Sequence, residues 1–165
     1  MINSNIRLSA EEFDKRIDNA VNYFKQGYNC SQSVVAAFAD LYGLKQDLAL
    51  KVASSFGGGI GRMRETCGAA CGLFMLIGLD CGSTDGKDNS SKSHNYAMVQ
   101  KYAQQFKEQN GSIICAELLG LKERPISPQA ETRTKEYYKK RPCVEMVRCA
   151  AKLFREYLQN EVYFE

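Results

Sequence analysis

Four of the seven cysteines in the chain stand where the sequence predicts the first turn of an α-helix, namely Cys30, Cys67, Cys115 and Cys143. The first backbone N–H groups of a helix have no partner within it, and the helix dipole places partial positive charge there. A thiol at this position is therefore expected to ionise more readily than a free thiol, and the thiolate is the form that redox chemistry and soft-metal binding both require. If the four helix starts meet in space, they form one concentrated cysteine site.

The spacing of these cysteines does not match the compact C-x-x-C ligand pairs of zinc ribbons and bacterial ferredoxins, so a shared site must be assembled by the tertiary fold. Such a site would hold an iron–sulfur cluster or another thiolate-bound metal, or it would cycle between dithiol and disulfide. The sequence leaves both versions of a redox protein open. The alternatives from other classes are a zinc site that holds the helices together and a helical interaction module in which the thiols only fill space.

Two glycines and two arginines before Cys67 are the candidate cofactor-binding residues. The glycine run at residues 57–61 predicts a sharp turn, and the backbone N–H groups of Gly58 and Gly59 would face an anion or a cluster sulfide. Arg62 and Arg64 would stabilise a thiolate or hold an anionic partner, unless they are ordinary surface charges. The run lacks the residues of a phosphate loop or a dinucleotide fingerprint, so no nucleotide is expected.

The other candidate side chains have weaker signals. Cys71 lies four positions after Cys67 on one predicted helix and faces the same way, as an auxiliary thiol or as a small residue in a tight contact. Cys149 is expected to be a core filler and Cys81 an exposed loop thiol. His94 is the only histidine, which excludes a multi-histidine metal site, and its polar surroundings argue against a Cys–His dyad.

Capping patterns and apolar periodicity predict the helices that position these residues. Ser9 with Glu12 and Asn29 with Gln32 match capping boxes at the first two helix starts. A third helix is predicted from about 47 to 56, with a buried stripe of Leu48, Val52 and Phe56, and a fourth from 67 to 79. A fifth follows a polar loop at 80–91 and ends near Gly111. A short helix over 113–119 begins after a Ser112 cap, and the last one begins at Pro142. The helix at 67–79 is apolar on nearly every side, as is typical of a central helix.

No segment alternates apolar and polar residues between turn signals, so no strand is expected. The predicted fold class is all-α, with residues 1–165 forming a single-domain bundle of about six or seven helices. A charged surface excursion is predicted at about residues 121–141, helical around residues 131–138.

Composition limits the partners and the compartment. The net charge of +3 is too small to indicate a nucleic-acid partner, and the apolar stretch at residues 69–79 is far shorter than a membrane span. No secretion signal is visible at the start, and an odd, low number of cysteines favours free thiols in a reducing compartment. We therefore expect a cytoplasmic protein with a redox partner that the sequence does not identify; a homo-oligomer stays open.

Short motifs in the chain resemble those of a known family, the small redox-active proteins named for the pattern C_GCAxxG_C_C, which has a C-G-A-x-x-G core. The matching segments are YNCSQ at 28–32, GRM at 61–63, CGAACG at 67–72, GSIIC at 111–115, ELLG at 117–120 and RPC at 141–143. The resemblance implies that Cys30, Cys67, Cys115 and Cys143 are the characteristic cysteines of the family and that the role is redox. A related domain accompanies haem and an iron–sulfur centre in split-Soret cytochromes, but this chain has no C-x-x-C-H segment, so no haem is expected.

Overall fold

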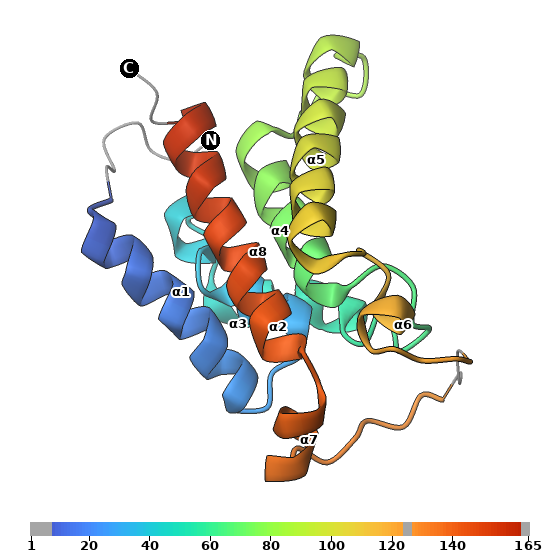
Figure 1. The fold of residues 1–165 in the computed structure, drawn as a ribbon. Helices are drawn as coiled ribbons and strands as arrows, with labels where there is room; N and C mark the ends of the chain where they lie inside the picture. Colours follow the sequence, from blue (N-terminus) through green and yellow to red (C-terminus); the bar gives the residue numbers. More distant parts are fainter. Residues whose placement is uncertain (1–7, 124–126, 163–165) are drawn as a thin grey trace.

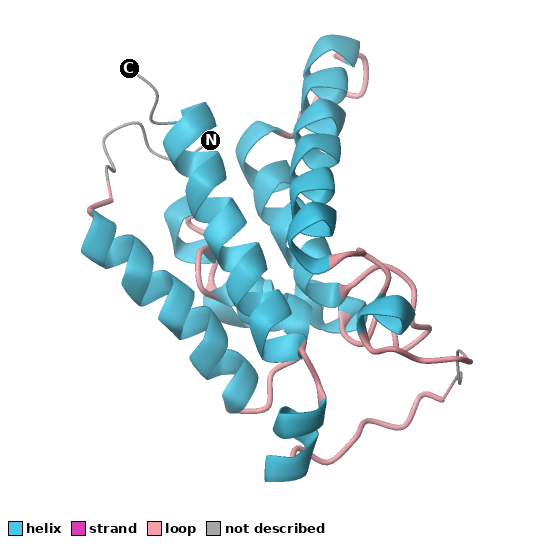
Figure 2. Ribbon diagram, viewed as in Figure 1, coloured by secondary structure: helices cyan, strands magenta, loops and turns pink. Residues whose placement is uncertain are grey.

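A computed structural model describes residues 8–123 and 127–162, and within them the chain is all-α, which confirms the predicted fold class (Figure 2). Six of the helices have seven residues or more. The α-helices are α1 (Ala10–Lys25), α2 (Cys30–Ala36), α3 (Gln46–Ala53), α4 (Gly68–Cys81), α5 (Asn89–Asn110), α6 (Cys115–Leu118), α7 (Lys135–Lys140) and α8 (Cys143–Tyr157). Short 3₁₀ turns at Ala39–Tyr42 and Ser54–Phe56 and a π turn at Leu158–Val162 complete the elements.

Local capping fixes the first two helix starts as predicted. The Ser9 hydroxyl accepts from the Glu12 N–H at 3.2 Å, and the Glu12 carboxylate accepts from the Ser9 N–H at 2.7 Å. Asn29 and Gln32 form the same reciprocal pair at the start of α2, with both bonds at 3.0 Å. Each pair satisfies backbone donors that a helix start leaves open, so the boundary is set by residues three positions apart.

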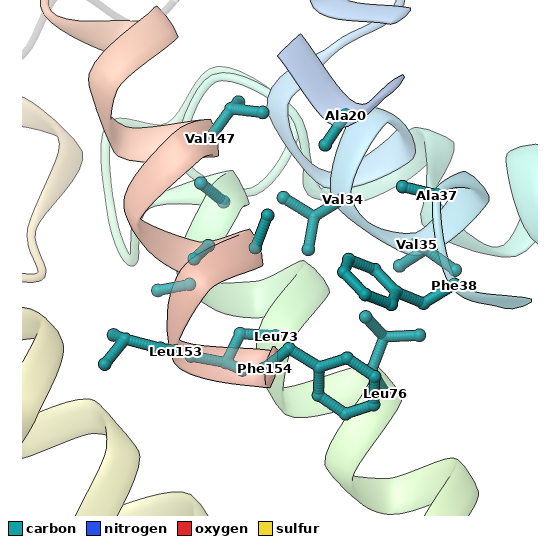
Figure 3. Packing of buried hydrophobic residues seen from close by; sticks show 14 of the residues in the cluster. Ala20, Val34, Val35, Ala37, Phe38, Leu73, Leu76, Val147, Leu153 and Phe154 are labelled. Carbon is teal, nitrogen blue, oxygen red and sulfur yellow. The ribbon is translucent and has the colours of Figure 1, made fainter. Parts of the chain in front are cut away.

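Helix α8 is the centre of the bundle. In Figure 1 it lies between α1 on one side and α4 and α5 on the other, with α2 behind it. Figure 3 shows the core between these helices, where Phe38, two residues after the end of α2, converges with Leu73 of α4 and Phe154 of α8. The Phe38 and Phe154 rings meet edge to face with centroids 5.0 Å apart. The core thus fixes the directions of α2, α4 and α8, three of the helices that carry the cysteines.

Helix α3 is rotated from the predicted orientation. Leu48 and Val52, expected in the buried stripe, are 48% and 53% exposed, whereas Ala49 and Ala53 are fully buried. Small side chains at the contact allow α3 to approach α2 closely, and the larger residues then face outward. The helix also ends at Ala53, before the 3₁₀ turn that carries Phe56.

Helix α4 packs closely against α2 because two of its residues lack side chains. A Cβ on Gly72 would lie 2.9 Å from the Val34 Cβ and 3.0 Å from the Ser31 carbonyl oxygen. A Cβ on Gly68, at the start of α4, would lie 2.7 Å from the Phe56 carbonyl oxygen and 3.3 Å from the Cys30 Cβ. The beginnings of α2 and α4 are therefore held side by side.

Helix α4 is apolar on nearly every side because it packs against α2, α5 and α8. Eight of its first ten residues are buried, and the helix has 14 residues. Within the described residues, no helix combines the length and the hydropathy that a bilayer crossing needs.

Replacing Gly72 by alanine should lower the free energy of unfolding by about 1–3 kcal/mol, because the added methyl group has no space against Val34. Gly78→Ala is the matched control on the same helix, since its Cβ would meet nothing within 4 Å. That variant should keep or gain stability, by up to about 1 kcal/mol from helix propensity. Urea unfolding followed by circular dichroism measures both, and equal losses in the two variants would contradict the close contact.

Candidate functional site

All four characteristic cysteines line one cavity of about 430 Å³. Cys30, Cys115 and Cys143 are the first residues of α2, α6 and α8. Cys67 stands one position before α4 and is its N-cap residue, not a member of the helix as expected. The bundle thus brings the starts of four helices to one place, although the cysteines are spread over the sequence.

A short backbone bridge joins the Cys67 and Cys115 segments. The Cys67 N–H donates to the Ile113 carbonyl oxygen at 2.7 Å, and the Cys115 N–H donates to the Glu65 carbonyl oxygen at the same distance. These bonds flank an isolated antiparallel pair, Thr66 and Ile114, which explains why α6 begins at Cys115 and not at residue 113 as predicted. The two cysteines are therefore held by backbone bonds and not only by side-chain packing.

The glycine run forms one wall of the cavity in a left-handed conformation. Positive φ angles run without a break over residues 58–62 and recur at Arg64. Glycine adopts such angles without strain, but Ile60, Arg62 and Arg64 do so at a cost of roughly 1 kcal/mol or more each. A Cβ on Gly59 would lie 2.5 Å from the Cys115 Cβ, so the wall meets that cysteine directly. Gly58, Gly59, Arg62 and Arg64, the candidate residues of this run, all line the cavity.

Cys30 and Cys143 both line the cavity, and the interaction between them shifts the pKa values of the two thiols in opposite directions. The bond from the Cys30 thiol stabilises a thiolate at Cys143, and together with the nearby charges of Arg141, Arg133 and Arg64 it lowers the Cys143 pKa to about 7. The pKa of Cys30 is raised well above its ordinary value by the same bond and by burial. Cys143 is therefore the member of the pair that ionises first, and Cys30 is the member that keeps its proton.

Cys67 and Cys115 do not ionise as readily as their positions at helix starts predict. Burial raises the pKa of Cys67 to about 12, although the N–H groups of Ala70 and Ala69 oppose the shift. Burial also raises the pKa of Cys115, and a hydrogen bond from Arg64 offsets only part of the increase. The helix-terminus argument is thus wrong for Cys30, Cys67 and Cys115, and the lowered pKa of Cys143 comes from Cys30 and the arginines and not from the helix end.

Sequence reasoning missed a carboxylate that joins three arginines at the cavity. Arg141 donates to both oxygens of Glu131 at 2.7 Å, Arg62 donates at 3.2 Å, and a terminal nitrogen of Arg64 lies 3.6 Å away. Burial acts to raise the Glu131 pKa, but the charges of Arg141, Arg62 and Arg64 lower it below its ordinary value. Glu131 and Arg133 lie in the predicted surface excursion, and no local motif marks them.

The segment before α8 also packs on the cavity through stacked rings and guanidinium groups. The Arg133 guanidinium carbon lies 4.5 Å from the Phe24 ring centroid and 4.6 Å from that of Tyr137. Arg141 lies 4.8 Å from the Tyr137 centroid. Helix α7, which carries Tyr137, begins at Lys135 after a Thr134 cap, so it starts later than the expected residue 131. These contacts position two arginines beside Cys143.

The remaining candidates do not line the cavity. Cys71 is buried with its sulfur 3.9 Å from the Thr66 carbonyl oxygen, and burial raises its pKa to about 11. Cys149 is buried between helices, where it contacts Asn110 and Gln109, and Cys81 contacts Asn95. His94 is exposed on α5.

The donor arrangement does not fit a metal ligand set. Within residues 8–123 and 127–162, no three His, Cys, Asp or Glu side chains converge closely enough to hold a metal ion. The four cysteines share the cavity walls, but a Cys₄ site needs all four sulfurs at bonding distance from one centre. Among the four cavity cysteines, Cys30 and Cys143 have the strongest effect on each other's pKa.

A protein-family model described as "Putative redox-active protein (C_GCAxxG_C_C)" matches residues 28–157. The chain belongs to this family. The match spans all four cavity cysteines, and it confirms the relationship that the sequence motifs indicate. Neither a curated protein nor a solved structure matches the chain significantly.

In this C_GCAxxG_C_C protein, alkylation should single out Cys143. Its reactive form is the thiolate, so its rate with iodoacetamide should rise with pH to half its maximum near pH 7, while Cys67, with a pKa of about 12, stays slow. Peptide mass spectrometry between about pH 5 and pH 10 gives the rates residue by residue.

Two arginine variants supply the controls. Arg141→Gln should move the Cys143 midpoint upward because a nearby positive charge is lost. Arg148→Gln should leave it in place, since Arg148 contacts Asp18 and Glu145 and does not line the cavity. A midpoint at the ordinary thiol pKa in the unmodified protein would contradict this description of the pair.

Proposed function

We propose that the protein is a dithiol oxidoreductase in which Cys143 is the attacking thiol and Cys30 the resolving thiol. The observation that carries the proposal is that Cys30 and Cys143 line one cavity, where the interaction between them lowers the pKa of Cys143 and raises that of Cys30. The family description as redox-active agrees with this chemistry without specifying it.

The reaction would proceed in two exchanges. The Cys143 thiolate attacks one sulfur of a substrate disulfide, the substrate S–S bond breaks, and the leaving thiolate takes the proton from Cys30. The Cys30 thiolate then attacks the Cys143 sulfur of the mixed disulfide, and the second substrate thiolate leaves and is protonated by water. Two electrons pass from the protein thiols to the substrate, and a dithiol reductant would restore the Cys30–Cys143 pair.

Each member of the pair is suited to its step. A thiol with a pKa near neutral pH combines a high thiolate fraction with good nucleophilicity, which favours Cys143 as the attacking group. Cys30 keeps its proton until charge develops on the leaving sulfur, so it can act as the acid for that step. Cys67 and Cys115 are buried neutral thiols, and we assign them no exchange step.

Serine replacements of the two thiols should give different products with a model disulfide. With bis(hydroxyethyl) disulfide, Cys30→Ser should accumulate a stable mixed disulfide at Cys143, because no resolving thiol is present. Cys143→Ser should react at least about tenfold more slowly, since the low-pKa nucleophile is lost. Cys149→Ser, outside the cavity, should match the unmodified protein and form the Cys30–Cys143 disulfide, as read by intact and peptide mass spectrometry.

The same preparations separate this proposal from the iron–sulfur alternative. Protein purified without air should be colourless, with iron and acid-labile sulfide well below one equivalent, and should be equally helical after chelation. Stoichiometric iron and sulfide that are lost on replacement of any one cavity cysteine would overturn the dithiol proposal. Equal disulfide reactivity in the Cys30, Cys143 and Cys149 variants would also overturn it.

A further inference from the structure

The cavity is strongly cationic beside its thiol pair. Four arginines line it, namely Arg62, Arg64, Arg133 and Arg141, and Glu131 is the single carboxylate among the described lining residues. That carboxylate is shared by three of the arginines, with the shortest contacts at Arg141. The Glu131 carboxylate and the Cys143 thiolate together carry two negative charges against four positive ones, so the partly desolvated space keeps an excess of positive charge that would attract an additional anion.

Arg64 is the least satisfied member of this set. Its residue is 4% exposed, its Nε has no hydrogen-bond partner, and its nearest carboxylate oxygen lies 3.6 Å away. Arg133 likewise has a buried Nη1 without a partner. Buried guanidinium groups are normally fully paired, because removing their charge from water is costly. Two incompletely paired arginines on one cavity wall indicate a site that an anionic ligand completes.

The backbone supports this interpretation independently. Arg62 and Arg64 both have positive φ angles, 65° and 63°, which L residues rarely adopt. Such strain persists where the surrounding structure imposes it, and it is concentrated at functional sites. Here the strained turn places both arginines on the cavity wall next to Cys115 and within reach of Glu131.

We propose that Arg62 and Arg64 bind a carboxylate of the substrate, so that the protein acts on small disulfides that carry carboxylate groups. In this proposal the Glu131 side chain occupies the position that the substrate carboxylate takes on binding. A cavity of about 430 Å³ has the size of a small-molecule site. The inference rests on the proposed dithiol function for the identity of the reacting bond, but the anion site itself is independent of it.

A charge series of disulfides of similar length tests the substrate class. The probes are dithiodipropionate, bis(hydroxyethyl) disulfide and cystamine, which carry negative, neutral and positive ends on two-carbon arms. Stopped-flow rates of Cys143 oxidation should favour dithiodipropionate over the neutral disulfide by at least about tenfold, with cystamine slowest. A change in the nucleophilicity of Cys143 alters the rates with all three disulfides alike, so it cancels when the rates are compared as ratios. Equal rates would overturn the assignment of the substrate class.

Arginine variants test which residues cause the preference for the negatively charged disulfide. Arg62→Gln should reduce the preference for dithiodipropionate to less than about threefold, and Arg64→Gln should act in the same direction. Arg62 is the cleaner variant because it is partly exposed and is not among the groups that lower the Cys143 pKa. Arg148→Gln is the matched control on a partly exposed arginine outside the cavity and should keep the full preference. A preference unchanged in both cavity variants would overturn the site.

Replacement of the resident carboxylate tests its role. Glu131→Gln should raise the rate with dithiodipropionate severalfold relative to the neutral disulfide and slow cystamine relative to it, because the arginines lose a competing carboxylate and the cavity becomes more positive. A decrease in the dithiodipropionate preference would show that Glu131 organises the arginines, and it would overturn the view that Glu131 stands in for the substrate.

Suberate separates this inference from the dithiol function, because in it two methylene groups replace the two sulfurs of dithiodipropionate. Calorimetry should detect suberate binding that is weakened about tenfold by Arg62→Gln and unaffected by Arg148→Gln. If suberate binds in this way but no disulfide oxidises Cys143, the anion site stands and the dithiol proposal falls. If disulfides react without charge preference and suberate does not bind, the anion site falls and the dithiol proposal stands.

Discussion

The close approach of α4 to α2 is the contact on which the rest of the site depends. It is possible only because Gly68 and Gly72 present backbone and not side chains to Cys30, Ser31 and Val34. This contact brings the start of α4 beside the start of α2, and the backbone bridge between Thr66 and Ile114 then adds the α6 segment. Helix α8 closes the cavity because its own apolar face packs on α1, α2 and α4. The positions of the four cysteines follow from these packing constraints.

Opposing electrostatic effects divide the four thiols into different chemical types. Burial favours the neutral form of every thiol, and at Cys67 and Cys115 it outweighs the nearby N–H or guanidinium groups. At Cys143 the hydrogen bond from Cys30 and the charges of Arg141 and Arg133 outweigh burial. Similar placement at a helix start therefore does not make the cysteines equivalent. The arginines and the neighbouring thiol decide which of them ionises.

The parts of the fold that sequence patterns predicted well are those fixed by short-range interactions. The Ser9 and Asn29 capping boxes involve residues three positions apart, and the buried face of α8 repeats at regular helical spacing. The α3 stripe was wrong because alanine and leucine can both face a core, and only the neighbouring helix decides between them. The cysteine set was identifiable from helix starts and family motifs, but burial, and hence the ionisation of each thiol, depends on the whole fold. Glu131 was missed because its arginine partners are 10 to 69 positions distant and share no pattern with it.

The Cys30–Cys143 pair joins two parts of the chain that the ribosome produces far apart in time. Cys30 emerges with the second helix, whereas Cys143, Arg141 and Arg133 emerge only after most of the other helices. Until then no partner thiol or guanidinium from that region can stabilise a thiolate, and every cysteine in the growing chain keeps the low reactivity of an ordinary thiol at neutral pH. The low pKa of Cys143 is therefore a property of the completed fold that no shorter part of the chain possesses.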